Sequence, residues 1–473
     1  MDYSGLAWHP WTPNPETAMI EVQNRHIVVI GAARSGLAAA LLLRQRGAKV
    51  FVTDHKSIKD TVKAKLAGHG IPFEENGHTT KAFQGDFAVL SPGVPTETPI
   101  VQHYLDDGKK IYSEIELASW YNKSNLVAVT GSNGKTTVTN WLDHTWTLAG
   151  RPHETAGNIG YAFSDAVRKA PEAADTLLEV SSFQLDHINT FRPHISLLLN
   201  ITPDHLDRYQ DDFAQYAAAK YRITENQSSG DWLIYNYDDS TVISHLDLLK
   251  KKDTAPRLLG FSTQQELSGG DGAFIRDDNI ILKINQQEEV LMPTSEVRLP
   301  GKHNITNGMA TALAARSSEI KSDVIRESLS SFEGVEHRLE LVRAVKGVDY
   351  VNDSKATNIN AVWYALDSFN MPMTLILGGL DKGNDYSEIA GQIRQKVHTI
   401  IAIGDAKPLI EEQLKSIVPH FKTANDMNEA VRTAKKGAKR GEIVLLSPAC
   451  ASFDMYDNYE HRGNEFKKAV NRL

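Results

Sequence analysis

The residues with the clearest chemical purpose lie in a short glycine turn between an apolar strand and a helix. The turn, residues 130–137, reads Thr-Gly-Ser-Asn-Gly-Lys-Thr-Thr. Such a turn points backbone N–H groups inward, and the helix N-terminus that follows adds positive potential, so an anion is stabilised there. Lys135 can reach the β- and γ-phosphates of a nucleotide, and the Thr136 hydroxyl can bind Mg²⁺. The residues expected to hold the phosphates are Gly131, Ser132, Asn133, Gly134, Lys135, Thr136 and Thr137.

This turn departs from the full phosphate-loop pattern G-x-x-x-x-G-K-[ST], because Val129 stands where the first glycine belongs. A chance glycine turn before a helix remains the alternative interpretation. The Gly-Lys-Thr end and the strand–turn–helix context favour a phosphate loop, and the missing glycine indicates a particular subclass of it.

Acidic and imidazole groups follow two further strands. Glu179 ends an apolar strand, where its carboxylate can complete the oxygen shell of Mg²⁺. A solvated glutamate is the alternative, although a charge that ends a buried strand is costly unless it is used. His205 follows the next strand together with Asp204 and Asp207. A histidine that only supports the fold is the alternative there, but three titratable groups at one strand end favour a functional site.

The elements that must position these groups form three blocks of alternating strands and helices, which predicts parallel sheets with ligand sites at the carboxyl ends of the strands. We expect an N-terminal extension over 1–24 and domains over 25–115, 116–333 and 334–473. The expected strands are 26–30, 48–53, 87–90, 110–112, 126–130, 176–180, 195–201, 232–236, 349–351, 374–377, 399–403 and 443–446, and the expected helices include 37–46, 135–148 and 304–315. A small β-rich insert is expected over about 250–298.

Composition limits the classes of function. The chain has 473 residues and a formal net charge of −8, which argues against general binding to nucleic acid or membrane surfaces because both are polyanions. The one cysteine, Cys450, permits no intrachain disulfide and fits a reducing cytoplasm; its apolar surroundings predict a buried thiol. The N-terminal segment lacks the pattern of a signal peptide, and no apolar run approaches the ~20 residues of a membrane span.

The first block contains Gly31-Ala-Ala-Arg-Ser-Gly36 and then Asp54 at the end of its second strand. Taken alone, this is a degraded dinucleotide fingerprint, because Ala33 replaces the glycine that would admit a pyrophosphate. A dinucleotide-dependent oxidoreductase is therefore one alternative, but it leaves the Lys135 turn unexplained.

Several motifs together resemble the Mur ligase family, which includes folylpolyglutamate synthetase. The resemblance runs from about His26 to the C-terminus, and the missing first glycine of the phosphate loop is typical of the family. It is carried by residues 130–137, 179–184, 200–208 and 301–307, and more sharply by 334–340, 352–358, 377–383 and 447–454. The fold implied is three α/β domains: a Rossmann-like N-terminal domain, a central P-loop ATPase-type domain with a parallel sheet, and a Rossmann-like C-terminal domain.

The third-block motifs look like those of the branch that joins D-glutamate to UDP-N-acetylmuramoyl-L-alanine in peptidoglycan biosynthesis. The resemblance implies an ATP-dependent cytoplasmic ligase, a monomer, that forms an acyl phosphate and supports cell-wall biogenesis, cell shape and cell division. Another amino-acid-adding ligase of the family, or a folylpolyglutamate-type enzyme, is the alternative. The Asp-Asn-Pro-Arg motif of the diamino-acid-adding ligase is absent from the sequence. A non-catalytic nucleotide-binding regulator is a further alternative.

The resemblance also implies roles for individual residues around the metal ions. Thr136 and Glu179 hold one Mg²⁺, and His205 helps to hold a second. Lys220 matches the position of a carbamoylated lysine, whose carbamate would offer oxygens to Mg²⁺ where an ammonium would repel it. Without the resemblance, the local sequence predicts that Lys220 is an ordinary surface lysine of a helix.

Further residues match substrate positions. Those assigned to the UDP-sugar substrate are Arg34, Ser35, His55, Lys56, Asn158 and Ser182, and those assigned to ATP in addition to the loop are Asn304, Asn307, Arg338 and Asp353. Lys355, Thr357, Lys382, Ser452 and Tyr459 match positions around the incoming glutamate. Tyr459 stands where the family often has phenylalanine. Closure of the third domain over ATP is expected, because ATP residues are assigned to both the second and the third domain.

Overall fold

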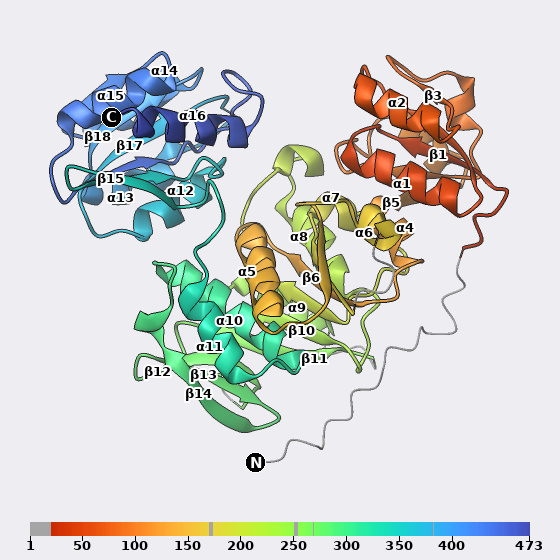
Figure 1. Ribbon diagram of the computed structural model, residues 1–473, viewed down its shortest axis with the longest axis horizontal. Helices are drawn as coiled ribbons and strands as arrows, with labels where there is room; N and C mark the ends of the chain where they lie inside the picture. The colour runs from red at the N-terminus through yellow and green to blue at the C-terminus, as the bar shows by residue number, and fades with distance from the viewer. Residues whose placement is uncertain (1–19, 170–173, 250–253, 268, 382) are drawn as a thin grey trace. The chain divides into compact units, whose positions relative to one another are not determined.

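The computed structural model describes residues 20–473 except 170–173, 250–253, 268 and 382. The predicted N-terminal extension lies almost entirely outside these residues. The described chain forms two compact units. The first comprises the residues up to Leu291 together with 310–325, and the second comprises 292–309 together with 326–473. Each unit is described separately below (Figure 1).

The first sheet has five parallel strands in the order β3-β2-β1-β4-β5. The strands are β1 (His26–Ile30), β2 (Lys49–Thr53), β3 (Phe73–Glu74), β4 (Phe87–Leu90) and β5 (Ile111–Ser113), and the helices are α1 (Arg34–Gln45), α2 (Asp60–Gly68) and α3 (Pro99–Asp106). Apolar side chains of α1 and α2 pack on one face of this sheet, and those of α3 on the other. Successive residues of a strand point to opposite faces, so the part of a strand that is covered on both sides must be apolar, as residues 27–30 of β1 are.

The second sheet has nine strands in the order β14-β13-β12-β11-β10-β9-β6-β8-β7. Its strands are β6 (Asn125–Thr130), β7 (His153–Gly157), β8 (Asp175–Glu179), β9 (Ile195–Leu198), β10 (Trp232–Asn236), β11 (Arg257–Ser262), β12 (Gly272–Arg276), β13 (Asn279–Ile284) and β14 (Gln287–Pro293). Neighbouring strands pair in parallel from β7 across the sheet to β12, and β13 pairs antiparallel with β12. β11–β14 confirm the expected β-rich insert within the described residues.

Helices of this region are α4 (Glu114–Ser119), α5 (Lys135–Leu148), α6 (Phe163–Lys169), α7 (Ser182–Leu185), α8 (Phe213–Tyr221), α9 (Ser240–Leu249), α10 (Lys302–Ser317) and α11 (Ser322–Ser331). The bounds of α5 are those predicted. β9 is shorter than the predicted strand 195–201, because Asn200 leaves the ladder and bonds to the glycine turn.

The helix α4 contributes to two cores. Leu117 packs with the first sheet, whereas Ile115 and Ala118 pack with the second. The Glu116 carboxylate accepts hydrogen bonds from the backbone N–H groups of 189–191, which lie between α7 and β9. The boundary predicted between residues 115 and 116 therefore falls inside a shared, buried helix.

The third sheet has six strands in the order β15-β16-β20-β17-β18-β19, parallel except for the hairpin of β15 and β16. Its elements are β15 (Glu340–Val345), β16 (Val348–Asn352), α12 (Ile359–Asp367), β17 (Met373–Gly378), α13 (Ala390–Lys396), β18 (Val397–Ile403), α14 (Lys407–Leu414), β19 (His420–Thr423), α15 (Met427–Gly437), β20 (Ile443–Leu446) and α16 (Tyr459–Asn471). α12, α13 and α14 pack on one face, and α15 and α16 on the other. Across the described part of the chain, no helix combines the length and apolar character needed to cross a membrane.

Candidate active site

The glycine turn before α5 is held in shape by backbone geometry. Gly131 has φ +153°, and a Cβ there would lie 3.1 Å from Leu199 Cβ and 3.2 Å from the Asn200 backbone. The Asn133 N–H donates to Asn200 Oδ1 at 2.8 Å, and Asn200 Nδ2 donates back to the Asn133 carbonyl at 3.0 Å. Gly134 precedes α5 with φ +88°, so the loop turns directly into the helix N-terminus. Asn200 thus orders the loop, a role that sequence reasoning did not assign to it.

Two lysine ammonium groups meet at one carbonyl of this loop. Lys135 Nζ donates to the Gly131 carbonyl at 2.7 Å and to the Ser132 carbonyl at 2.9 Å. Lys220 Nζ, on α8, donates to the same Gly131 carbonyl at 2.9 Å. Lys220 is only 2% exposed, so the interpretation as a surface lysine is wrong. Its burial, followed by the charge of Lys135, lowers the pKa of Lys220 well below its ordinary value.

Glu179 ends β8 beside the loop and is buried. Its Oε1 accepts a hydrogen bond from Asn158 Nδ2 at 2.7 Å. Its Oε2 is buried and has no hydrogen-bond partner among the described residues. A buried carboxylate oxygen without a partner is costly, and a hard cation would satisfy it. This geometry fits the oxygen-rich Mg²⁺ site expected for Glu179 and Thr136.

The segment after β9 carries His205, the other predicted metal ligand, and belongs to the same unit as Glu179. His205 adopts φ +52°, and its Nε2 lies 3.8 Å from Asp204 Oδ2. The imidazole packs edge-on against Phe183, with ring centroids 5.4 Å apart. Ser182 is buried at the start of α7, next to Phe183.

In the first sheet, Gly31 and Gly36 allow a close approach of backbone, since a Cβ at Gly36 would lie 1.8 Å from the Gly31 carbonyl oxygen. The Asp54 Oδ2 accepts the Ala32 N–H at 2.7 Å. Four of the six residues assigned to the UDP-sugar follow the carboxyl ends of β1 and β2. They are Arg34, Ser35, His55 and Lys56. His55 and Lys56 are exposed.

Arg34 makes contacts that the sequence did not predict. Its guanidinium donates to the carbonyls of Gly160 at 2.7 Å, Asn158 at 2.9 Å and Gly157 at 3.2 Å. Arg34 therefore braces the loop that carries Asn158, which in turn bonds to Glu179. The assignment of Arg34 to UDP stays a prediction.

In the second unit, Arg338 and Asp353 lie together, with Arg338 Nη1 3.7 Å from Asp353 Oδ1. Ser447 Oγ donates to Asp353 Oδ2 at 2.8 Å. Burial raises the pKa of the Asp353 carboxyl to about 6, although the charge of Arg338 opposes this shift. Asn304 and Asn307 are buried on α10, one helical turn apart.

Two of the residues assigned to glutamate, Lys355 and Tyr459, lie together at the start of α16. Lys355 Nζ lies 3.4 Å from the Tyr459 hydroxyl and 5.2 Å from the centroid of its ring. Ser452 is buried and Thr357 is exposed. Lys382 lies outside the described residues.

The sequence alone did not identify Arg462, and of Cys450 it predicted only the burial. Arg462 is almost fully buried, and it donates to the Ser354 carbonyl at 2.8 Å and to the Cys450 carbonyl at 3.0 Å, which ties the loop after β20 to the loop after β16. Only its position in α16 relative to Tyr459 could have indicated it. Cys450 is buried as predicted, and burial raises the pKa of its thiol to about 12.

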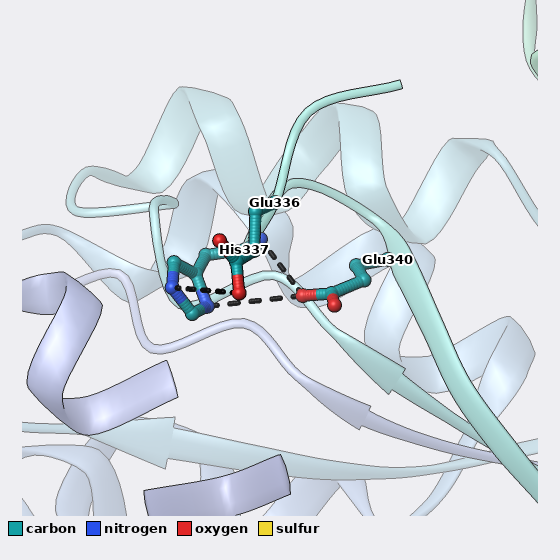
Figure 2. Close-up of side chains that lie close together, drawn as sticks. All are labelled: Glu336, His337 and Glu340. Carbon is teal, nitrogen blue, oxygen red and sulfur yellow. Dashed lines mark hydrogen bonds and ion pairs between the residues drawn. The ribbon is translucent and has the colours of Figure 1, made fainter. Parts of the chain in front are cut away.

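Glu336, His337 and Glu340 are the one group of three metal-binding side chains found close together in the described residues (Figure 2). They do not leave room for a metal ion, because the Lys467 ammonium lies 2.7 Å from Glu336 Oε1 and 2.6 Å from Glu340 Oε1. The group is an ion-pair network.

Three family models match the chain. They are the MurD N-terminal domain over residues 26–100, the Mur ligase middle domain over residues 129–315, and the Mur ligase glutamate ligase domain over residues 337–450.

Similar proteins match over nearly their whole length. A UDP-N-acetylmuramoylalanine–D-glutamate ligase of Salinibacter ruber is 47% identical, with 96% of this chain and 99% of that protein covered. A protein of the same name from Chloroherpeton thalassium is 43% identical, with the same shares covered. Among solved structures, the UDP-N-acetylmuramate-alanine ligase of Thermotoga maritima superimposes with a TM-score of 0.59 at 17% identity, covering 95% of this chain and 100% of the other. That likeness concerns the fold.

Proposed function

Since the chain belongs to the Mur ligase family, we propose that it is the ATP-dependent ligase that adds D-glutamate to UDP-N-acetylmuramoyl-L-alanine in peptidoglycan biosynthesis. The observation that carries the phosphoryl chemistry is the Lys135 loop beside a buried Glu179 oxygen that has no hydrogen-bond partner in the described part of the chain. The choice of acceptor and amino acid rests on relatives of that name, 43–47% identical over nearly the full length. A match to the N-terminal domain model counts against a folylpolyglutamate-type enzyme.

The reaction proceeds in two displacements. The substrate carboxylate attacks the γ-phosphorus of ATP, the bond to the β-phosphate oxygen breaks, and ADP leaves. The acyl phosphate is then attacked by the amine of D-glutamate, the amine loses a proton, and inorganic phosphate leaves. A carboxylate is a poor acyl donor until phosphorylation makes its oxygen a good leaving group. The protein contributes mainly position and positive charge.

Lys135 supplies that charge by exchanging partners. In the structure its ammonium is bonded to the carbonyls of Gly131 and Ser132. Bound phosphate oxygens attract the ammonium more strongly than neutral carbonyl oxygens do, because they also carry negative charge. The ammonium therefore turns from the carbonyls of its own loop to the transferring phosphoryl group.

The metal site proposed for this chain holds two Mg²⁺ ions. Thr136 and Glu179 would hold one, and His205 would help to hold the second. Bound Mg²⁺ neutralises charge that develops on the phosphate oxygens. Support for this proposal comes from the buried, unpartnered Glu179 Oε2.

Lys220 is proposed to react with CO₂. Its neutral amine attacks the carbon, the nitrogen loses a proton, and a carbamate with one negative charge forms. Only the neutral amine is nucleophilic, and the burial of Lys220 beside Lys135 lowers its pKa in the required direction. Carbamoylation would replace the Lys220 amino group at the Gly131 carbonyl by a carbamate, whose oxygens can bind Mg²⁺.

Carbon-13 NMR tests the carbamate without reference to turnover. Protein equilibrated with ¹³C-bicarbonate is expected to show one slowly exchanging carbamate resonance that is absent from Lys220→Met. A spectrum identical for the two proteins would contradict carbamoylation. Lys65→Met, on exposed α2, is the control for carbamates at other lysines.

The substrates are assigned by the residues that match the family. Arg34, Ser35, His55, Lys56, Asn158 and Ser182 serve the UDP-sugar, and Asn304, Asn307, Arg338 and Asp353 serve ATP. Lys355, Thr357, Lys382, Ser452 and Tyr459 serve D-glutamate. The chain is proposed to act as a cytoplasmic monomer, which is consistent with its single buried thiol.

Phosphate release from ATP tests the whole assignment. With UDP-N-acetylmuramoyl-L-alanine present, a panel of amino acids is expected to give turnover with D-glutamate and not with L-glutamate or diamino acids. Lys135→Ala is expected to lose at least about a hundredfold in rate, since it removes charge from the transition state. Undiminished ligation by Lys135→Ala would overturn the proposed chemistry, and turnover with another amino acid would overturn the proposed specificity.

A further inference from the structure

The loop that carries Arg338 is held in an unusual backbone conformation. His337 has φ +64° and Leu339 has φ +46°, so the residues on both sides of Arg338 lie in the left-handed region. Side-chain-bearing L-residues rarely adopt this region, because Cβ crowds the following carbonyl oxygen. Specific contacts must therefore hold this loop.

Glu340 supplies the contact to the backbone. Its Oε2 accepts the His337 N–H at 2.9 Å and the Asn352 side-chain amide at 3.0 Å. Glu340 and Asn352 face each other across the β15–β16 hairpin. The same amide lies 2.9 Å from His337 Nδ1. Because the Asn352 Nδ2 can only donate, the His337 Nδ1 accepts this hydrogen bond. Burial lowers the pKa of His337.

Lys467 holds Glu340 from the opposite side. Its ammonium, on α16, lies 2.6 Å from Glu340 Oε1 and 2.7 Å from Glu336 Oε1. Burial alone would lower the pKa of Lys467, but the two carboxylates outweigh burial and raise it. Figure 2 shows the Glu336 and Glu340 carboxylates next to the His337 ring, each joined to it by a dashed line. Lys467 thus fixes the carboxylate that fixes the backbone.

The backbone of residues 337–339 makes hydrogen bonds to Asp353 and to Lys355. The Leu339 N–H donates to Asp353 Oδ1 at 3.3 Å, the same oxygen that lies 3.7 Å from the Arg338 guanidinium. The His337 carbonyl accepts the Lys355 N–H at 3.1 Å. One short loop therefore sets the position of Arg338, assigned to phosphate, and of the segment that carries Lys355.

We propose that Glu340 and Lys467 are positioning residues, which hold the left-handed backbone at His337 and so aim the Arg338 guanidinium at the phosphates of ATP. This inference rests on the proposed function, since it takes ATP as the ligand of Arg338. Neither residue touches substrate in this role. Lys467 acts through Glu340, and Glu340 acts through the His337 N–H and Asn352.

The test compares Lys467→Met and Glu340→Gln with Lys468→Met in the full chain. Lys468 is the next residue of α16, and its ammonium pairs with Glu465 at 2.8 Å, which makes it a matched control. Both test variants are expected to raise KM for ATP by about three- to tenfold and to leave KM for the UDP-sugar unchanged, because a charge-assisted hydrogen bond that orients one ligand group is lost. Lys467→Arg, which keeps the charge and the donors, is expected to restore the wild-type KM.

Amide hydrogen exchange gives a readout independent of catalysis. The His337 amide is expected to exchange at least about tenfold faster in Lys467→Met, while the amides of β17 keep their wild-type rates. A general loss of stability would speed both sets of amides and would overturn the positioning role.

Arg338→Gln separates this inference from the proposed function. If Arg338→Gln raises KM for ATP and Lys467→Met and Glu340→Gln do not, the positioning role is overturned and the proposed function stands. If Arg338→Gln leaves KM for ATP unchanged, Arg338 does not serve ATP, and the assignment on which the inference rests fails. A higher KM in all three variants, with the Lys468→Met value unchanged, is the expected result.

Discussion

Lys135 and Lys220 donate to the same carbonyl oxygen of Gly131, and this shared acceptor explains much of the chemistry expected at the loop. Two ammonium groups this close repel each other, and the buried one bears the greater cost of charge. Burial and the charge of Lys135 therefore lower the pKa of Lys220. A neutral, buried amine is the form needed for reaction with CO₂.

Glu179 gives the first prediction at the scale of single residues. Glu179→Gln keeps the shape of the side chain and removes the charge that Mg²⁺ requires, so phosphate release should fall at least about a hundredfold. In metal-free protein the same change should raise the melting temperature, because it removes a buried carboxylate oxygen to which no described residue donates. Mg²⁺ titrations of activity and melting in EDTA measure the two effects. Unchanged turnover would contradict the metal assignment.

Tyr459 gives a second prediction at this scale. Its hydroxyl lies 3.4 Å from Lys355 Nζ, a long contact, whereas its ring lies under the same ammonium. Tyr459→Phe should therefore change KM for D-glutamate by less than about threefold, since most of a cation–π contact survives. Lys355→Met should raise that KM much more. Steady-state kinetics at saturating ATP compare the two variants, and equal large effects would refute this ranking.

At the scale of elements, α4 joins two sheets through two buried carboxylates. Glu116 accepts from the N–H groups of Asn189, Thr190 and Phe191 and from the Trp120 indole at 2.7 Å, so its charge is well solvated by the protein. The Glu114 carboxylate accepts fewer hydrogen bonds than that of Glu116. Its Oε1 accepts the Ser164 N–H at the start of α6, but its Oε2 is buried without a partner among the described residues.

This contrast predicts how stability depends on pH. Burial raises the pKa of Glu114 from 4.5 to about 7. Between these values the folded protein holds a proton that the unfolded chain has lost, so the free energy of unfolding falls as pH rises from 4.5 to 7. The difference is 2.5 pKa units, or ~3 kcal/mol at an order-of-magnitude level.

Glu114→Gln should remove this contribution, because the amide carries no titrating proton. The variant is expected to be more stable than wild type at pH 8 and about equal to it at pH 4.5. Urea unfolding at a series of pH values measures the slope. Asp353, whose pKa is also raised by burial to about 6, keeps its contribution in both proteins and cancels in the comparison. Parallel stability curves for the two proteins would show that Glu114 stays ionised in the fold.

At the scale of the whole molecule, the residues assigned to ATP are divided between the two compact units. Lys135 belongs to one unit and Arg338 to the other. If one ATP engages both, binding must restrict the two units relative to each other, because a single rigid ligand then links them.

Solution scattering tests this expectation. The radius of gyration should decrease when a non-hydrolysable ATP analogue and the ligated product are added together, and should change less with either alone. Lys135→Ala with the same ligands is the control, since it should weaken the contact to one unit. An unchanged radius with both ligands would count against closure.

Local patterns in the sequence were sufficient for the phosphate loop and for several elements. α5, β10 and β20 have the predicted bounds, because strand apolarity, a glycine turn and a helix start are all encoded within a few neighbouring residues. The Mur ligase fold and the ligase activity followed from motifs of the same local kind.

Long-range partners were decided only by tertiary structure. Lys220 reads as a surface lysine in its helix but lies beside Gly131, 89 residues away in sequence. Arg34 also bonds to the Asn158 carbonyl, 124 residues away, and Lys467 bonds to Glu340 across 127 residues. The physical reason is that a side chain's type limits which bonds it can make, whereas its burial and its partner depend on which distant surfaces the packed core brings together.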